Sequence, residues 1–200
     1  DSDGIAELRA DYELKDGVPV FIFVGRLFWY KGLHLIFDSL KQLSERGIEY
    51  KMLVVGDGGD REEMEKYTRE LGIADSCIFV GAINSREELR YYYSASDLFL
   101  FPSLYDTNGI VVREAAACGL ASILIKGSCA AEDFTDQHNA ILTENDVESF
   151  TGDLIFAASH LAELKRIGEN AMNEVYLSWE SAVERAYDRY SVVIENCKHG

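Results

Sequence analysis

Two cations closely follow the first predicted strand of this sequence. Arg26 and Lys31 stand in the stretch Gly25–Gly32, directly after the apolar run Val20–Val24. Arginine offers a planar fork of N–H donors and lysine a compact charge, and both suit phosphate oxygens. Held at one sheet edge, the two cations would form a clamp for a diphosphate. The alternative is that both are surface charges paired with nearby carboxylates.

Two carboxylates stand eight positions apart in a second stretch. Asp106 precedes Gly109 and Glu114 follows it, where a predicted strand gives way to a predicted helix. A helix N-terminus presents unpaired N–H groups and a positive dipole, which favour an anion. Carboxylates there could accept hydrogen bonds from sugar hydroxyls. The alternative is that Asp106 or Asn108 merely caps the helix and that Glu114 is solvated.

A glycine-rich stretch, Gly56–Arg61, follows the second predicted strand. It resembles a dinucleotide-binding fingerprint, but that pattern requires glycine at the sixth place, where Arg61 stands, and it follows the first strand of its unit. We therefore expect a tight turn in which Asp60 caps the next helix. A redox Rossmann domain is correspondingly disfavoured, and the absence of a P-loop or a Gly-x-Ser-x-Gly elbow leaves NTPase and serine hydrolase functions without support.

Short apolar runs alternate with amphipathic stretches along the chain and must position these groups. The pattern predicts strands at 20–24, 52–55, 77–80, 98–101, 122–125 and 140–142, and helices at 33–45, 61–71, 86–94, 110–118 and in most of the chain from 147 onward. This alternation is typical of βαβ units. It predicts one α/β domain over residues 1–200, a doubly wound, Rossmann-like parallel sheet whose ligands bind at the carboxyl ends of the strands.

Composition and charge narrow the classes of partner. The 200 residues include 48% apolar residues, and 19 Lys and Arg stand against 35 Asp and Glu, a net charge of −16. Nucleic acid is excluded as a partner because phosphate backbones require a basic face. The same charge disfavours this segment as the part that docks on anionic lipid. Any bound anion must meet a small local cluster of positive groups.

The cysteines and histidines form no metal pattern. The four cysteines have no CxxC pair, and the four histidines form no cluster, so we expect no metal and reduced thiols in a cytoplasmic protein. The chain begins without a basic region followed by an apolar stretch, so no signal peptide is expected. It also lacks an initial Met, which suggests a cut through a longer protein.

Taken together, the stretches after the strands resemble one family. The resemblance covers roughly residues 20–142 and is carried by FVGRLFWYKGL, VVGDGGDREEME, IFVGAINSREELRYYYSASDLFLFPS and YDTNGIVVREAAACGLASI, in the family's order. The sequence resembles the glycosyltransferases of family 4, in the C-terminal, donor-binding half of their two-domain GT-B fold. The resemblance implies a hexosyltransferase that uses a nucleoside-diphosphate sugar with retention of configuration. It also implies an N-terminal acceptor-binding domain as partner, which this segment lacks.

The resemblance also implies roles for individual residues. Arg26 and Lys31 would hold the donor diphosphate, Asp106 would contact the donor sugar and Glu114 the nucleoside ribose. The remaining donor-binding positions lie in turns, where the backbone would face the sugar, the phosphate or the nucleobase. They are Gly25, Gly81, Ile83, Asn108, Gly109, Ile110 and Val111. No cofactor or metal is implied. Three departures stand out: Asp106 replaces the usual glutamate, Asn108 a frequent phenylalanine, and Gly127–Glu132 lacks the usual glycine pair.

Several functions remain open at this point. The donor is expected to be UDP-glucose-like, and the acceptor, diacylglycerol or a cell-surface glycan, would meet the missing half. The isolated segment is expected to bind donor without turnover. The full-length protein would be cytoplasmic, with any contact to the inner membrane face of the cell envelope made by that half. The alternatives are a sucrose- or glycogen-synthase-like enzyme on the same fold and a non-catalytic sugar-nucleotide-binding module, which Asp106 favours.

Overall fold

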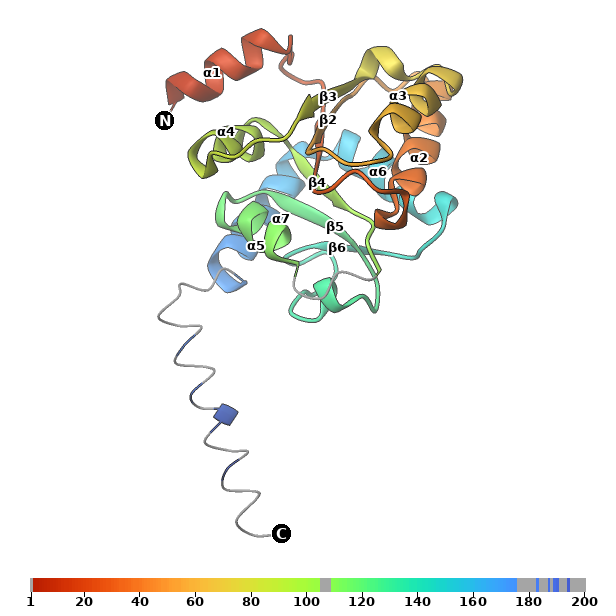
Figure 1. The fold of residues 1–200 in the computed structure, drawn as a ribbon. Coiled ribbons are helices and arrows are strands. Elements are labelled where there is room, and N and C mark those ends of the chain that lie inside the picture. Colours follow the sequence, from red (N-terminus) through yellow and green to blue (C-terminus); the bar gives the residue numbers. More distant parts are fainter. Residues whose placement is uncertain are drawn as a thin grey trace.

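A parallel β-sheet forms the centre of the protein in the computed structural model. The structure describes residues 2–104 and 109–175, together with Val183, Tyr187, Arg189, Tyr190 and Ile194. The strands follow the order β3-β2-β1-β4-β5-β6, all parallel (Figure 1), and they are β1 (Val20–Val24), β2 (Lys51–Val55), β3 (Cys77–Gly81), β4 (Leu98–Phe101), β5 (Ala121–Ile125) and β6 (Ile141–Thr143). The doubly wound α/β prediction is confirmed, and β6 lies one residue later than expected.

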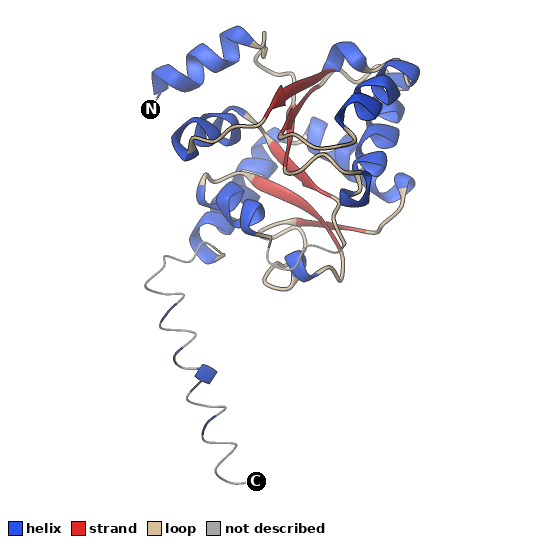
Figure 2. Ribbon diagram, viewed as in Figure 1, coloured by secondary structure: helices blue, strands red, loops and turns tan. Residues whose placement is uncertain are grey.

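Helices cover both faces of the sheet (Figure 2). Their bounds are α1 (Ser2–Asp11), α2 (Leu33–Glu45), α3 (Arg61–Glu70), α4 (Arg86–Ala95), α5 (Ile110–Ala117), α6 (Val147–Ser159) and α7 (Leu161–Glu174). Figure 1 shows α2, α3 and α6 on one side of the sheet and α1, α4 and α5 on the other. Short 3₁₀ turns lie at Trp29–Lys31, Ala74–Ser76 and Cys129–Ala131.

The sheet is buried on both faces because its strands are apolar almost throughout. Phe21 and Phe23 of β1 belong to the cluster beneath α2 and α6, whereas Ile22 and Val24 belong to the cluster beneath α4 and α5. All five residues of β1 are buried. Successive residues of a strand point to opposite faces, so one apolar run serves both clusters.

Helix α1 was not expected from the sequence. Ile5, Leu8 and Tyr12 lie at helical spacing, but the helix is short and only weakly amphipathic. It is held by packing on α4, where the hydroxyls of Tyr12 and Tyr92 are hydrogen bonded at 3.0 Å. Of the three tyrosines in α4, Tyr92 and Tyr93 are buried in the cluster beneath that helix, and Tyr93 meets Phe99 of β4 edge to face.

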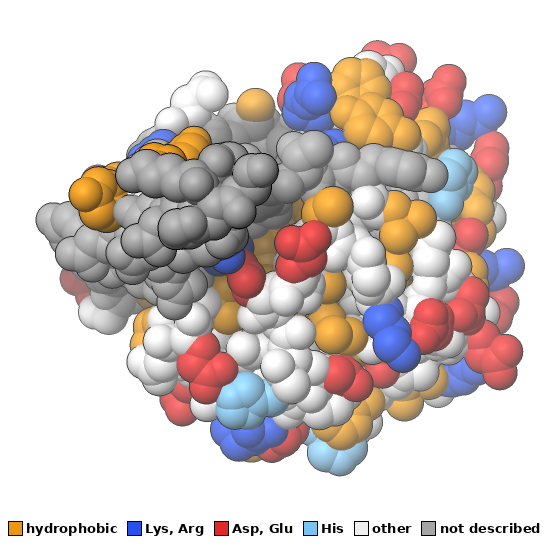
Figure 3. Space-filling view, turned by 90° about the horizontal axis from the view of Figure 1, so that it is seen from below, with side chains coloured by type: hydrophobic (Ala, Val, Ile, Leu, Met, Phe, Trp, Pro, Cys, Tyr) orange, Lys and Arg blue, Asp and Glu red, His pale blue; other side chains and the backbone are white. Residues whose placement is uncertain are grey.

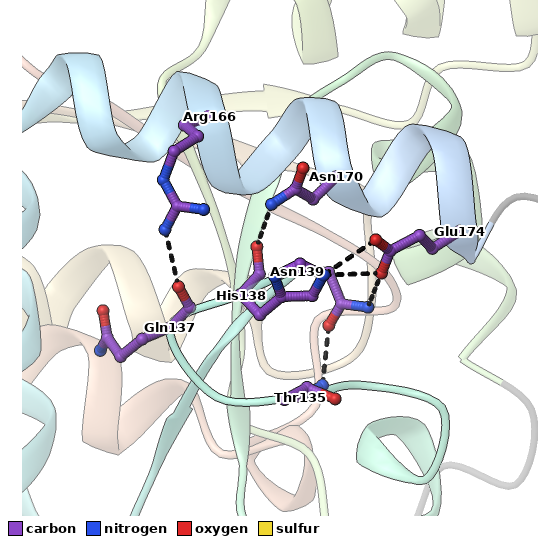
Figure 4. Close-up of polar contacts among 7 residues, drawn as sticks. All are labelled: Thr135, Gln137, His138, Asn139, Arg166, Asn170 and Glu174. Atoms are coloured by element: carbon purple, nitrogen blue, oxygen red, sulfur yellow. Dashed lines mark hydrogen bonds and ion pairs between the residues drawn. The ribbon is translucent and has the colours of Figure 1, made fainter.

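A dense polar network, here called the α7 junction, joins the turn before β6 to helix α7 (Figure 4). Glu174 accepts hydrogen bonds from the Asn139 amide at 3.0 Å and contacts His138 at 2.8 Å. Arg166 and Asn170 donate to backbone carbonyl oxygens of the turn. The complete set comprises Thr135, Gln137, His138, Asn139, Arg166, Asn170 and Glu174. It joins the turn before β6 to helix α7.

The surface charge is dispersed. On the face drawn in Figure 3, acidic side chains lie scattered among apolar and neutral atoms and do not form one continuous field. Many cations are paired with carboxylates, including Arg61 with Glu65 at 2.9 Å and Lys126 with Glu144 at 3.2 Å. None of the helices in the described part of the chain is long and apolar enough to cross a membrane.

Candidate functional site

Packing and hydrogen bonds fix the backbone of the loop after β1. Its cations are Arg26, which is exposed, and Lys31, which is half-buried. Leu27 is fully buried, and its backbone N–H donates to Asp57 O at 3.0 Å. Trp29 stacks on His34 with ring centroids 3.8 Å apart and meets Phe37 edge to face. These anchors hold the backbone between Arg26 and Lys31.

Arg26 and Lys31 both adjoin the ring of Tyr30. The Arg26 guanidinium donates a hydrogen bond to the Tyr30 hydroxyl at 3.1 Å and lies 5.5 Å from the centroid of Phe28. The Lys31 ammonium lies 5.5 Å from the Tyr30 centroid. The two cations therefore gather around one aromatic side chain. Arg26 forms no ion pair with a carboxylate among the described residues, and its partners are a tyrosine hydroxyl and an aromatic ring.

The glycine-rich stretch after β2 packs directly against the β1 loop. A Cβ on Gly56 would lie 1.8 Å from Gly25 O, and Gly56 also has a positive φ of 132°. Only glycine permits this contact between two backbones. The prediction that Asp60 caps α3 is wrong: its side chain makes no cap hydrogen bond and instead accepts from Trp29 N at 2.8 Å. Asp60 therefore holds the β1 loop.

The start of α5 lies beside the loop after β5, and the β1 loop abuts the end of β4. Gly109 has φ +48° at the N-cap, and a Cβ there would come within 3.2 Å of the Ala130 Cβ. Ile110 is 63% exposed. Gly32, next to Lys31, approaches Pro102, which follows β4; a Cβ on Gly32 would lie 2.8 Å from its carbonyl oxygen. The loops after β1 and β4 thus converge at the carboxyl ends of adjacent strands.

Two adjoining cavities open at this edge. The first, about 310 Å³, is lined by Val24, Gly25, Arg26, Val55, Gly56, Asp57, Ala82, Ile83 and Leu89. The second, about 430 Å³, lies between α4 and α5 and is lined by Arg86, Leu89, Arg90, Tyr93, Glu114, Ala117 and Cys118. Leu89 lines both cavities. Each has the volume of a small-molecule site, and we call the two cavities with their surrounding loops the carboxyl edge.

Tyr93 links the two helices that bound the second cavity. Its hydroxyl donates to Val111 O at 3.4 Å, which ties the first turn of α5 to α4. Burial raises the pKa of the Tyr93 hydroxyl, and the nearby charge of Glu114 raises it further. Burial likewise raises the pKa of the Cys118 thiol. Both groups therefore remain neutral near pH 7 beside the Glu114 carboxylate.

The structure brings together part of the predicted site. Gly25, Arg26 and Ile83 line the first cavity, and Glu114 lines the second. Gly81 lies at the end of β3, where its carbonyl oxygen accepts from Gly56 N at 2.8 Å. Lys31 adjoins Tyr30, and the helix start supplies Gly109, Ile110 and Val111. Asp106 and Asn108 lie outside the described residues.

Other residues at the carboxyl edge were not among the site residues predicted from the sequence. Gly56 and Asp57 line the first cavity, and their position after the strand next to β1 was the available signal. Arg61 donates to Phe79 O at 3.2 Å and so contacts the backbone of β3. Arg86, Leu89 and Arg90 carried no motif, and only the docking of α4 beside α5 brings them to the second cavity. Among described residues, no group of three or more potential ligands is placed to hold a metal ion.

Comparison with known families decides the classification. A family model described as "Glycosyl transferases group 1" matches residues 4–174, most of the chain. The chain belongs to this family. An uncharacterized glycosyltransferase of Methanocaldococcus jannaschii is 25% identical over 190 residues, which cover 94% of this chain and 48% of that protein. The alpha-monoglucosyldiacylglycerol synthase of Streptococcus pneumoniae is 27% identical over 117 residues, 58% of this chain and 26% of that protein.

Solved structures place this group 1 glycosyltransferase in the GT-B fold. Sucrose-phosphate synthase of Thermosynechococcus elongatus gives a TM-score of 0.81 at 23% identity, covering 96% of this chain and 49% of that one. Anabaena HepE, solved in complex with UDP-glucose, gives 0.76 at 23% identity, covering 86% and 48%. The chain spans about half the length, or less, of the curated relatives it matches and about half of these two solved structures. The six-stranded sheet corresponds to one Rossmann-like domain of that fold.

Proposed function

We propose that this chain is the donor-binding domain of a retaining hexosyltransferase and binds a UDP-glucose-like sugar nucleotide. The observation that carries the proposal is the gathering of Arg26 and Lys31 around Tyr30, beside a cavity lined by Ile83 and adjoining one lined by Glu114. The group 1 family supports a transferase, and HepE, a neighbour in fold, was solved with UDP-glucose.

The proposed chemistry is electrostatic. Transfer breaks the bond between the anomeric carbon and the donor phosphate, so negative charge develops on the departing diphosphate. Arg26, Lys31 and the N-terminus of α5 would neutralise that charge. The acceptor hydroxyl would form the new bond on the same face of the sugar and pass its proton to the departing phosphate. These groups are part of the protein, so the proposal requires no metal or other cofactor.

The greater length of the relatives bears on which part of the protein could supply the acceptor site. Because the chain spans about half the length of the relative from Methanocaldococcus, we propose that an N-terminal domain of the same protein supplies the acceptor site. The isolated chain should then bind donor without transferring sugar. Measured transfer to an acceptor by this chain alone would contradict this point.

For the full-length protein we propose a lipid acceptor, diacylglycerol, with a cell-surface glycan as the alternative, and a position at the inner face of the cell membrane. The pneumococcal relative, an alpha-monoglucosyldiacylglycerol synthase by name, supports the lipid. The fold neighbour sucrose-phosphate synthase favours a second candidate, transfer to a soluble sugar phosphate. Product analysis of the full-length enzyme with both acceptor classes would distinguish them.

Nucleotide binding tests the proposed function directly. Calorimetric titration of the chain with UDP and UDP-glucose should give dissociation constants in the micromolar-to-millimolar range, about −8 to −4 kcal/mol. Arg26→Ala and Lys31→Ala should each weaken UDP binding about tenfold or more, because each removes a charge from the proposed diphosphate site.

Arg69→Ala is the matched control. Arg69 is an exposed arginine on α3 that lines neither cavity, so its replacement should leave UDP binding unchanged. Failure of UDP, GDP and ADP to bind would overturn the proposed function. If Arg26→Ala, Lys31→Ala and Arg69→Ala all changed UDP affinity equally, the proposed role of the β1 loop in binding the diphosphate would be contradicted.

A further inference from the structure

Two arginines on α4 face the second cavity. Arg86, Leu89, Arg90 and Tyr93 follow the spacing i, i+3, i+4, i+7, which places them on one side of a helix. All four line the space between α4 and α5, opposite Glu114. The helix is held in place by the buried Tyr93 and by a cap in which Glu88 N donates to the Ser85 hydroxyl. The arginine backbones are therefore positioned by groups other than the arginines themselves.

Both arginines are exposed, and neither is hydrogen bonded or ion paired with a described residue. Within residues 2–104 and 109–175, Arg86 and Arg90 make no hydrogen bond and no ion pair, although Glu114 lines the same cavity. Other arginines of this acidic chain are matched to carboxylates, such as Arg61 with Glu65 and Arg166 with Glu163. Ten N–H donors of two guanidinium groups thus border a cavity without a described acceptor.

The position of this cavity relates the arginines to one part of a nucleotide. Leu89 is shared with the first cavity, which Arg26 borders. A diphosphate at Arg26 and a ribose at Glu114, as in the proposed function, leave the nucleoside's base beside Leu89 and the α4 arginines. Gly25 and Arg26 of the β1 loop line the first cavity and not the second.

Guanidinium groups discriminate among bases because they only donate hydrogen bonds. Guanine presents the acceptors O6 and N7, which arginine binds with two parallel hydrogen bonds, and uracil, like thymine, presents the carbonyl oxygen O4. Adenine presents an N6 amino donor at the corresponding position. Two guanidinium groups facing that amino group would meet a donor with donors and could form no hydrogen bond to it.

We propose that Arg86 and Arg90 determine base specificity and select a nucleobase with a carbonyl oxygen, uracil or guanine, over adenine. This inference rests on the proposed function, since it requires that the carboxyl edge bind a nucleotide. It assigns specificity to two side chains in addition to the backbone positions at Gly81 and Ile83. Leu89 would provide the apolar contact for the plane of the base.

The test compares the ratio of dissociation constants for ADP and UDP across variants. The ratio isolates the base, because the diphosphate and its long-range attraction to any cation are the same in both ligands. The chain should bind UDP at least about tenfold more tightly than ADP, the discrimination typical of a good arginine–base contact. Arg86→Gln and Arg90→Gln should each reduce that ratio, and the double variant should bring it close to one.

Matched control variants show whether a change in the ratio comes from recognition of the base, from loss of a positive charge or from loss of folded structure. Arg69→Gln makes the same charge change away from both cavities and should keep the ratio. Arg26→Ala should weaken UDP and ADP equally, again with the ratio unchanged. Uridine and adenosine, which carry no phosphate, should show the same preference at lower affinity. Circular dichroism and Tm would exclude loss of structure as the cause of any change.

The outcomes are distinguishable. If UDP binds but ADP binds equally well, or if both glutamine variants keep the ratio, the inference about Arg86 and Arg90 is overturned while the proposed function stands. If no nucleotide binds, both fall. A reduced ratio in both glutamine variants, with Arg69→Gln unchanged, supports the assignment.

Discussion

The carboxyl edge and the α7 junction are both polar, yet they satisfy their polar groups differently. At the α7 junction, Glu174 is matched to His138 and Asn139, and Arg166 to a backbone carbonyl oxygen and Glu163. At the carboxyl edge, Arg26 donates to a neutral tyrosine hydroxyl. The junction is complete within the protein, whereas the edge retains donors that an anionic ligand can use. The side-chain network of the junction is thus satisfied internally, whereas Arg26 at the edge is not matched to a described carboxylate.

The largest expected effect comes from breaking the backbone contact beneath the carboxyl edge. Gly56→Ala should destabilise the protein by about 3 kcal/mol or more, because its Cβ would meet Gly25 O at 1.8 Å in a left-handed conformation. Gly47→Ala is the control, since Gly47 also has positive φ but no atom within 4 Å of the added Cβ. It should cost about 1 kcal/mol. Chemical denaturation measures both, and equal losses would contradict the importance of the contact.

Glu114 should affect binding without affecting stability. If it accepts a hydrogen bond from the ribose, Glu114→Ala should weaken UDP binding about tenfold, as expected for a hydrogen bond to a charged group. UDP lacking both ribose hydroxyls should bind the wild type and the variant equally. Calorimetry with both ligands measures this coupling. A variant that still distinguishes the two ligands as the wild type does would rule out a ribose contact.

The α7 junction should show the reverse behaviour and a dependence on pH. Hydrogen bonds from His138 and Asn139 lower the pKa of Glu174, so its contribution to stability is present above the pKa of the unfolded chain. That contribution disappears as the pH falls through the lowered folded-state pKa. Glu174→Gln should lower Tm by about 1–3 °C near pH 7, and the difference from wild type should vanish once the pH lies below the lowered pKa of Glu174 in the folded protein.

UDP affinity is the second measurement on this variant. It should not change, because Glu174 lines neither cavity. Glu169→Gln is the control for charge, since Glu169 is exposed on the same helix and makes no described hydrogen bond or ion pair. A pH-independent Tm difference for Glu174→Gln would show that the junction does not depend on the carboxylate.

The smallest expected effect concerns the reactivity of three thiols, of which Cys118 lines the second cavity. Burial raises the pKa of Cys77 to about 12, so this thiol should resist iodoacetamide in the folded protein, whereas the exposed Cys129 should react. Cys118 is half-buried at the wall shared with Glu114, and UDP should slow its alkylation. Mass spectrometry of the modified peptides measures all three. Rapid modification of Cys77 would contradict its burial, and no UDP effect at Cys118 would place the ligand elsewhere.

The sequence by itself determined the order of elements and the location of the candidate site. Local patterns sufficed because apolar runs buried on both faces, such as Val20–Val24, and amphipathic helices, such as Leu33–Glu45, carry their periodicity within a few residues. The position of Arg26, Lys31 and Glu114 after strands of a parallel sheet then placed them at one edge.

Only the tertiary structure decided which neighbours those residues meet. Asp60 has the residue type of a helix cap, but the approach of the β1 loop turned its carboxylate toward Trp29 N. Helix α1 depends on its contact with Tyr92, far along the chain, and the joining of Arg90 and Glu114 around one cavity depends on how α4 and α5 pack. These contacts join residues distant in sequence, and no local periodicity encodes the free energy that selects them.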